Sequence, residues 1–213
     1  MKSATANLTL VVGLGNPGDK YNQTRHNAGF WYIDQLAGRL GARFSYEKRF
    51  QAHLAAVLVD GRKLRLMKPG TYMNHSGRAL AAVAHYYDVP AGEILIAHDE
   101  LDLPPGTVRL KRGGGHGGHN GLRDVIAALG EREFWRLRIG IGHPGQRDDV
   151  IDYVLHRASV VEQQAIDEAL QKGLAETEPL LAGELERVMH VLHSSNASAG
   201  PGPAPKTEAP DGV

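Results

Sequence analysis

The sequence predicts a single α/β domain built as a three-layer sandwich, in which a mixed, twisted β-sheet is flanked by helices. Short apolar segments rich in branched residues alternate along the chain with longer segments of helical periodicity. The pair Asp60-Gly61 separates two alternating segments, which is typical of an antiparallel hairpin. The length of 213 residues, of which 42% are hydrophobic, suits one domain with a sizeable core.

The first element is a strand over Leu8–Leu14, a short apolar run that ends at the turn Gly15-Asn-Pro-Gly18 and is expected at the centre of the sheet. A helix follows, with Thr24 as its expected N-cap and Gly41 as its stop. Its apolar stripe consists of Phe30, Ile33, Leu36, Ala37 and Leu40. The chain therefore opens with a strand, a loop and a helix.

The middle of the chain continues this alternation. The two hairpin strands are Ala52–Val59 and Leu64–Met67. An Ala-rich amphipathic helix from about Asn74 to Tyr87 comes next. It is followed by a strand over Ile94–Ala97, which runs into the polar residues His98-Asp-Glu100.

The last predicted elements are a strand over Val108–Arg112, a short helix over Asn120–Leu129 closed by Gly130, and a strand over Arg136–Ile141. Ser159 and Glu162 then form a capping box before a long helix. The core positions of that helix are Ile166, Leu170 and Leu174.

The C-terminal segment Ser194–Val213 differs in composition from the rest of the chain. Its twenty residues include four Pro, three Gly, three Ser and four Ala, with no Leu, Ile or aromatic residue. Such a segment cannot bury enough apolar surface to offset the entropy of ordering it. The sequence therefore predicts a folded domain over residues 1–193 and a disordered tail over residues 194–213.

Composition excludes several classes of protein. The chain has no cysteine, which rules out disulfide scaffolds, thiolate metal sites and cysteine nucleophiles. No apolar stretch reaches the roughly 18 residues of a membrane helix, and Met1–Asn7 lacks the apolar region of a signal peptide. We therefore expect a cytosolic protein without a membrane partner.

Charge is unevenly distributed, although Lys plus Arg and Asp plus Glu both number 24. Between residues 104 and 147, three acidic residues stand against eight basic ones: Arg109, Lys111, Arg112, Arg123, Arg132, Arg136, Arg138 and Arg147. Between residues 148 and 187, ten acidic residues outnumber three basic ones. A basic segment of this kind favours a polyanionic partner, or else forms an ordinary basic sheet edge.

The run Gly13-Leu-Gly-Asn-Pro-Gly18 resembles a dinucleotide-binding fingerprint, since it follows a strand and precedes a helix. Pro17 removes a backbone donor, however, and the residues that follow form a polar loop rather than a helix. The loop is better suited to presenting Asn16 at the carboxyl end of the strand, where open α/β sheets bind ligands.

A histidine and a carboxylate are expected at this same edge. His26 stands at the start of the first helix. Asp99 follows the apolar strand Ile94–Ala97 and emerges at the same sheet edge, so its carboxylate could hold the imidazole in one tautomer. The alternatives are a surface histidine and a solvated acidic turn. Asn74 stands near a helix start, where capping alone would account for it. Ser76 lacks the nucleophile-elbow motif and is discounted as a nucleophile.

The segment Gly113–Gly118 holds five glycines in six residues and is interpreted as a mobile lid. His116 lies within this segment and His119 directly follows it; the two could bind a metal, but no third ligand stands at a known spacing. We therefore predict no metal site.

Six ordered motifs closely resemble those of bacterial peptidyl-tRNA hydrolases over roughly Leu8 to His193. They are Gly13-Leu-Gly-Asn-Pro-Gly18, Thr24-Arg-His-Asn-Ala-Gly29, Thr71-Tyr-Met-Asn-His-Ser-Gly77, His98-Asp-Glu-Leu-Asp102, Gly113-Gly-Gly-His-Gly-Gly-His-Asn-Gly121 and Leu137-Arg-Ile-Gly-Ile-Gly-His-Pro-Gly145. The resemblance implies a monomeric cytosolic enzyme without a cofactor, which cleaves the ester between a peptide and the terminal ribose of tRNA and so recycles prematurely released peptidyl-tRNA.

The resemblance also implies a role for individual residues. His26 corresponds to the catalytic base and Asp99 to its orienting partner. The positions implied to bind the peptide ester, the water or the leaving ribose are Asn16, Asn74 and Asn120, and those lining the cleft are Tyr21 and Met73. Tyr72 is also expected to bind the substrate. Lys111 and Arg138 correspond to the residues that bind the 5′ phosphate of tRNA. Arg109 has no assigned role, because relatives can carry lysine there.

Two other functions are compatible with parts of this pattern. One is an RNA-binding protein of the same fold without hydrolase activity, against which the retention of His26, Asp99 and the three asparagines argues. The other is a nucleotide-binding or phosphorolytic α/β enzyme, which the lack of a phosphate-binding loop disfavours.

Overall fold

A computed structural model describes residues 7–146 and 148–194 of the chain. Its sheet has seven strands in the order β2-β3-β4-β1-β5-β7-β6. The strands are β1 (Leu10–Gly13), β2 (Ser45–Glu47), β3 (Ala52–Val59), β4 (Arg62–Pro69), β5 (Ile94–Glu100), β6 (Val108–Arg112) and β7 (Trp135–Gly140). The predicted central position of the first strand is confirmed.

The sheet is mixed, as predicted. The four inner strands β4, β1, β5 and β7 run parallel to one another. The outer strands pair antiparallel, with β2 on β3, β3 on β4, and β6 on β7. Parallel strands place their carboxyl ends at one edge, so the segments that follow β1, β4 and β5 meet there.

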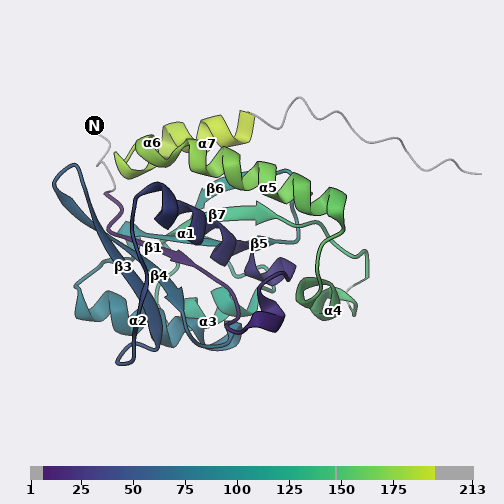
Figure 1. Ribbon diagram of the computed structural model, residues 1–213, viewed down its shortest axis with the longest axis horizontal. Helices are drawn as coiled ribbons and strands as arrows, with labels where there is room; N and C mark the ends of the chain where they lie inside the picture. The colour runs from purple at the N-terminus through teal and green to yellow at the C-terminus, as the bar shows by residue number, and fades with distance from the viewer. Residues whose placement is uncertain (1–6, 147, 195–213) are drawn as a thin grey trace, which may run out of the picture.

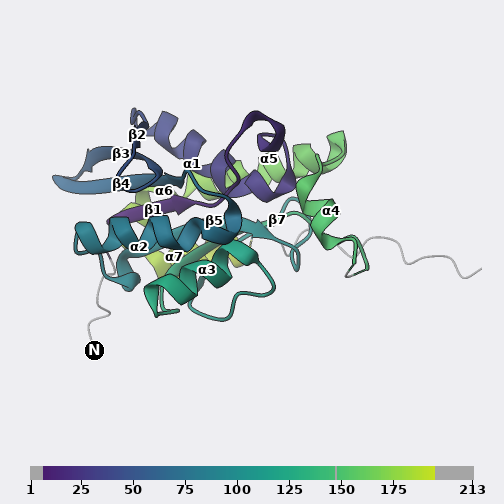
Figure 2. The ribbon, with the colours of Figure 1, turned by 90° about the horizontal axis from the view of Figure 1, so that it is seen from below.

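Helices cover both faces of the sheet and form the predicted three-layer sandwich (Figure 1). One face packs against α1 (Ala28–Arg39), α5 (Val160–Ala175), α6 (Thr177–Leu181) and α7 (Leu185–Ser194). The other packs against α2 (Ser76–Tyr86) and α3 (Asn120–Leu129), which lie side by side in Figure 2. A short helix, α4 (Val150–Leu155), lies beyond the end of β7. Each face thus has its own apolar core.

Two glycines allow the first helix to lie directly on the sheet. A Cβ atom on Gly29 would be 2.3 Å from the carbonyl oxygen of Ala97, and one on Gly13 would be 2.3 Å from the carbonyl oxygen of Gly29. No larger residue fits at either position without displacing backbone. This close approach brings the N-terminal end of α1 against the ends of β1 and β5. Gly13 of the first motif therefore serves the packing of α1 on the sheet.

The first helix begins later than the sequence indicates. Thr24 precedes a 3-10 turn, η2 (Arg25–Asn27), and its hydroxyl donates to the carbonyl of Tyr21 instead of capping the α-helix, which starts at Ala28. Phe30 and Leu40 are only half-buried, because the buried stripe of the helix includes Tyr32 in addition to Ile33, Leu36 and Ala37.

Other predicted boundaries also shift by a few residues. The second helix starts at Ser76, after a 3-10 turn, η3 (Met73–His75), so Asn74 is not its cap. The capping box of Ser159 and Glu162 is present at the start of α5. The sequence analysis missed β2, α4, α6 and α7.

The last helix, α7, extends one residue past the predicted end of the folded domain at residue 193. Ser194 is the last residue of α7, and its hydroxyl donates to the carbonyl of His190. Residues 195–213, which make up the rest of the predicted tail, lie outside the described residues. Among the described residues, no helix is long and apolar enough to cross a membrane.

Candidate active site

His26 and Asp99 meet at the carboxyl edge of the parallel strands. The turn η2 carries His26, and Asp99 is the penultimate residue of β5. The Nδ1 atom of His26 lies 3.0 Å from Oδ1 and 2.9 Å from Oδ2 of Asp99. A carboxylate can only accept, so Nδ1 carries the proton and Nε2 keeps a free lone pair. No described residue bonds to this Nε2, and the His26 side chain is 10% exposed.

Burial and charge act against each other in this pair. Burial by itself lowers the pKa of His26, but the charge of Asp99 and the hydrogen bond to it outweigh that effect and raise the pKa above 6.5. Burial would raise the pKa of Asp99, yet His26 and His119 hold it well below 3.8. At neutral pH the site therefore contains an ionised carboxylate behind a histidine whose basicity is increased.

Asn16 is held in one orientation by its neighbours. Its Oδ1 accepts a hydrogen bond of 2.8 Å from the backbone N–H of Met73, which identifies the other side-chain atom as a donor. The side chain of Asn27 makes two hydrogen bonds to the backbone of Asn16. Its Oδ1 accepts from the N–H of Asn16, and its Nδ2 donates to the carbonyl oxygen of Asn16. The Nδ2 donor of Asn16 has no hydrogen-bond partner among the described residues, so it is available to a ligand.

His119 makes a second hydrogen bond to Asp99. It occupies the N-cap of α3, where its Nδ1 accepts from the backbone N–H groups of Gly121 at 3.1 Å and Leu122 at 3.2 Å. Its Nε2 lies 3.0 Å from Oδ1 of Asp99. The two imidazole rings of His26 and His119 are 5.0 Å apart between centroids. One carboxylate thus contacts two histidines.

The ligand atoms of His26, Asp99 and His119 lie within 4.8 Å of one another, which is compact enough for a metal ion. The hydrogen bonds oppose that use. Since Nδ1 of His119 accepts from two N–H groups, the ring proton is on Nε2, the atom that would have to bind the metal. A ligating histidine carries its proton on the other nitrogen. The arrangement fits a hydrogen-bonded trio better than a metal centre.

The structure places Tyr21 and Tyr72 in edge-to-face contact, with their ring centroids 6.2 Å apart. Met73 is buried, and its sulfur fills the space that a side chain on Gly121 would need. Asn74 and Asn120 are exposed, and the Asn120 side chain accepts from Arg123. Among the described residues, no hydrogen bond joins either asparagine to the His26–Asp99 pair.

A basic face lies beside the site on β6 and β7. Arg109 is opposite Arg138 and Lys111 is opposite Arg136 across the antiparallel pair, so these four side chains share one face of the sheet. Lys111 is exposed, whereas Arg138 donates to Glu100 at 2.8 Å. Arg136 donates to the carbonyls of Gly114 and Gly115. Arg136 thereby restrains the glycine-rich segment that the sequence analysis interprets as a lid.

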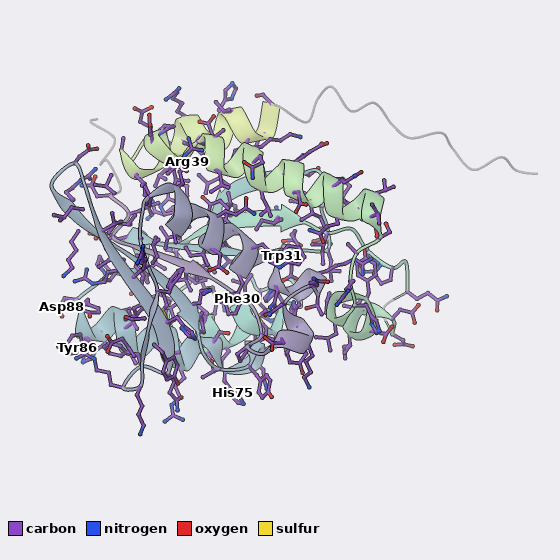
Figure 3. The ribbon with its side chains drawn as sticks, in the orientation of Figure 1. Phe30, Trp31, Arg39, His75, Tyr86 and Asp88 are labelled. Carbon is purple, nitrogen blue, oxygen red and sulfur yellow. The ribbon has the colours of Figure 1, made fainter. Side chains whose placement is uncertain are left out.

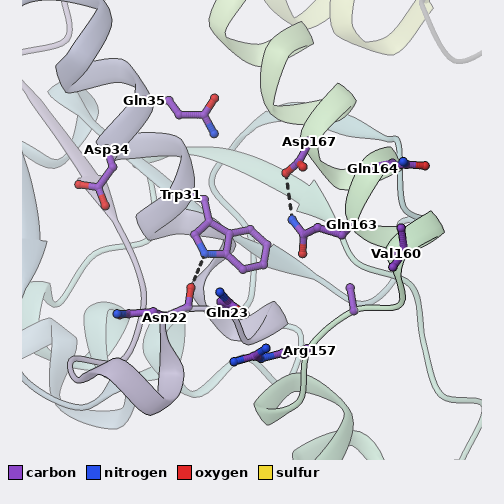
Figure 4. A pocket seen from close by; sticks show the side chains of 11 residues that line it. Asn22, Gln23, Trp31, Asp34, Gln35, Arg157, Val160, Gln163, Gln164 and Asp167 are labelled. Atoms are coloured by element: carbon purple, nitrogen blue, oxygen red, sulfur yellow. Dashed lines mark hydrogen bonds between the residues drawn. The ribbon is translucent and has the colours of Figure 1, made fainter.

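Two other features lie apart from these residues. A hollow of about 660 Å³ separates α1 from the start of α5, and none of the sequence-predicted site residues lines it (Figure 4). It holds Trp31, whose Nε1 donates to the carbonyl of Asn22. Tyr86 and Asp88 lie at the far end of α2 from His75, where Tyr86 packs against Phe50 (Figure 3). The chemistry-bearing side chains gather instead at the edge that holds His26.

The α/β sandwich with a histidine–carboxylate pair at the carboxyl edge of its parallel strands has the architecture of an enzyme whose site suits acid–base chemistry. A family profile described as peptidyl-tRNA hydrolase matches residues 10–199. The chain belongs to the peptidyl-tRNA hydrolase family.

Individual relatives agree with this assignment. The peptidyl-tRNA hydrolase of Halorhodospira halophila is 50% identical over 194 residues, which are 91% of this chain and 100% of the relative. That of Alkalilimnicola ehrlichii is 53% identical over 188 residues, 88% of this chain and 95% of the relative. The crystal structure of peptidyl-tRNA hydrolase from Acinetobacter baumannii superposes with a TM-score of 0.86 at 45% identity, covering 89% of this chain and 96% of that one.

Sequence reasoning missed the contributions of Asn27 and His119. Asn27 directly follows His26, and its amide holds the backbone of Asn16. The residue types around His119 indicate only a metal ligand or a neighbour of the glycine-rich segment. Its position immediately before the helix start at Asn120 was the available signal, because a residue there can cap the helix.

Proposed function

We propose that this chain hydrolyses the ester bond between the peptide and the terminal ribose of peptidyl-tRNA, using water activated by His26. The observation that carries the proposal is the geometry of the histidine. Its Nδ1 is bonded to Asp99, and its Nε2 has no partner among the described residues. Nε2 is therefore free to accept a proton from water.

The reaction needs one nucleophile and two proton transfers. Water attacks the ester carbonyl carbon while His26 Nε2 accepts a proton from the water. The carbonyl carbon becomes tetrahedral, and the carbonyl oxygen takes up the electron pair of the C=O π bond and becomes an oxyanion. When the intermediate collapses, the carbon–oxygen bond to the ribose breaks and Nε2 returns the proton to the ribose oxygen. The products are a tRNA with a free terminal hydroxyl and a peptide with a free carboxylic acid, which then loses its proton to solvent and becomes a carboxylate.

Polar donors stabilise the charge that develops in this step. The Nδ2 of Asn16 is a fixed donor at the same sheet edge, suited to the peptide ester or its oxyanion. By resemblance, Asn74 helps to position the ester and the water, and Asn120 assists near the leaving ribose. By the same resemblance, Tyr21 and Met73 line the cleft that takes the substrate, and Tyr72, which contacts Tyr21, is proposed to bind the substrate as well.

The basic face on β6 and β7 is proposed to bind the tRNA part of the substrate. Lys111 and Arg138 lie on the same face of the sheet, two positions apart along the β6–β7 pair, and are proposed to bind the 5′ phosphate of the acceptor arm. Neutralising phosphates with such side chains makes affinity sensitive to salt. The chain is proposed to act as a cytosolic monomer without cofactor.

The competing proposal is an RNA-binding protein of this fold without hydrolase activity. It predicts tRNA binding with no ester cleavage, whereas hydrolysis requires the free Nε2 of His26. Hydrolysis of N-blocked aminoacyl-tRNA by the full chain separates the two, with the free-amine aminoacyl-tRNA as the comparison substrate.

The matched variants are His26→Ala and His190→Ala, the second of which removes an exposed histidine from α7. Loss of the general base is expected to reduce kcat by about 10² to 10⁴. His26→Ala should retain tRNA affinity, and His190→Ala should match the wild type. A wild-type chain that binds tRNA without cleaving the ester would favour the competing proposal. A His26→Ala variant with most of its kcat would show that another residue is the base.

A further inference from the structure

The hydrogen bonds of His119 assign its ring proton. Backbone N–H groups of Gly121 and Leu122 both point at Nδ1, at 3.1 and 3.2 Å, so Nδ1 must supply a lone pair. The proton therefore resides on Nε2, which lies 3.0 Å from Oδ1 of Asp99 and donates to it. An imidazolium at this position would lose both bonds and would bring a positive charge to the N-terminus of α3.

The two histidines on Asp99 are consequently not equivalent. His26 donates through Nδ1 and keeps Nε2 free, whereas both nitrogens of His119 are engaged by described residues. His26 can gain a proton during the reaction without breaking a bond. His119 cannot.

We infer that His119 is a positioning residue: the N-terminus of α3 fixes its tautomer, and its Nε2–H holds the carboxylate of Asp99 that orients His26. This role rests on the proposed hydrolysis and extends it to a third side chain. It also couples the helix start to the site, because His119 both caps α3 and bonds to Asp99.

The groups that face this cluster come from four elements. Asp99 and His98 belong to β5, His26 to η2, and His119 to the cap of α3. The His98 ring is 5.1 Å from that of His119, and Arg136 acts on His98 from β7. A donor to a carboxylate withdraws part of its charge, so loss of the His119 bond is expected to raise the pKa of His26 further.

Two variants separate the cap from the bond to Asp99. His119→Asn places an amide oxygen near the position of Nδ1, so the helix cap is kept and the donor to Asp99 is lost. His119→Gln places an amide nitrogen near the position of Nε2, so the donor is kept and the cap is lost.

We expect His119→Asn to keep the wild-type Tm, to raise the pKa of His26 in an NMR titration, and to lower kcat by about tenfold, the scale typical of outer partners. His119→Gln should show a lower Tm, with the pKa of His26 near the wild-type value and kcat partly restored. Nitrogen-15 correlation spectra of wild-type His119 should show a protonated Nε2 and an unprotonated Nδ1.

The inference is overturned by a proton on Nδ1 in those spectra, or by a His119→Asn variant with unchanged His26 titration and unchanged kcat. Equal losses in both variants, with no change in the His26 titration, would assign His119 a packing role only. The NMR arms need no substrate. A wild-type chain that fails to hydrolyse N-blocked aminoacyl-tRNA would contradict the proposed function and leave these arms to decide the role of His119.

Discussion

The Nδ1 atom of His26 lies 3.0 and 2.9 Å from the two carboxylate oxygens of Asp99, although 73 positions separate the residues along the chain. The contact forms because Gly29 lets the start of α1 approach the ends of β1 and β5. A buried carboxylate behind an imidazole does two things at once. It fixes the tautomer, and it stabilises the positive charge that the ring gains in the transition state.

Replacing Asp99 by Asn tests both effects. The side-chain shape is nearly kept, but the negative charge that raises the pKa of His26 is lost, and burial then lowers that pKa. Because the base works unprotonated, the acidic limb of the kcat profile should move to lower pH. We expect kcat to fall by about 10² to 10⁴. Profiles of kcat against pH for both proteins measure this. An unchanged limb with near-normal kcat would reduce Asp99 to a structural role.

Arg25 should hold the turn that carries His26. Its buried guanidinium donates to the carbonyls of Tyr153, His156 and Arg157 and to the Glu162 carboxylate, which ties η2 to α4 and to the start of α5. We expect Arg25→Ala to lower the free energy of unfolding by about 3 kcal/mol, because several acceptors lose their donor. The kcat should fall as well, since the turn is no longer anchored.

Urea unfolding measures the effect of Arg25→Ala, with Arg39→Ala as the matched control on the exposed side of α1 (Figure 3). Arg25→Lys should not restore stability, because an ammonium group cannot reproduce the planar fork of donors. Equal unfolding midpoints for Arg25→Ala and Arg39→Ala would contradict the anchoring role.

Lys111 and Arg138 are both proposed to bind phosphate, but only Arg138 is paired with a carboxylate, that of Glu100. Lys111→Ala and Arg138→Ala should each weaken tRNA binding and reduce the slope of log K against log salt by about one unit. Arg138 is paired with Glu100, so Glu100→Gln should strengthen binding by freeing the guanidinium for phosphate. Binding isotherms at several salt concentrations give these slopes. Slopes that match the wild type in both alanine variants would remove this pair from the phosphate site.

His98 should make the protein sensitive to acid. Burial, with a smaller effect of His119, lowers the pKa of His98 from 6.5 to about 3. Between those values the unfolded chain binds a proton that the folded chain does not, so the free energy of unfolding falls as the pH drops through this window. In the wild type, Nδ1 of His98 bonds to the backbone carbonyl of Asp99. The amide of Asn in a His98→Asn variant can donate the same hydrogen bond, but it has no group that titrates in this pH range.

Urea unfolding at several pH values between about 3 and 6.5 compares the two proteins. His98→Asn should be less stable at neutral pH because it leaves a cavity, and its stability should change less on acidification. Identical pH slopes for wild type and variant would show that His98 becomes protonated in the folded state.

Several local features could be predicted because they depend on neighbouring residues alone. Asp60 and Gly61 have positive φ angles of 49° and 74°, as a two-residue hairpin requires, and the pair was recognised from its residue types. The capping box at Ser159 was recognised in the same way. The strand β2 was missed because Ser45–Glu47 is short, mostly exposed and without apolar alternation. It forms only because β3 is available to pair with it.

The sequence by itself determined the alternation of strands and helices, the mixed sheet with its first strand at the centre, and the sheet edge at which Asn16, His26 and Asp99 were expected. These follow from apolar periodicity and from residue types that suit turns and caps. Only the tertiary structure decided that His119 shares Asp99 with His26, that Asn27 grips Asn16, and that Glu100 pairs with Arg138. Hydrogen bonds between distant segments depend on distances of a few tenths of an ångström, which the packing of α1 and α3 on the sheet sets and no local pattern encodes.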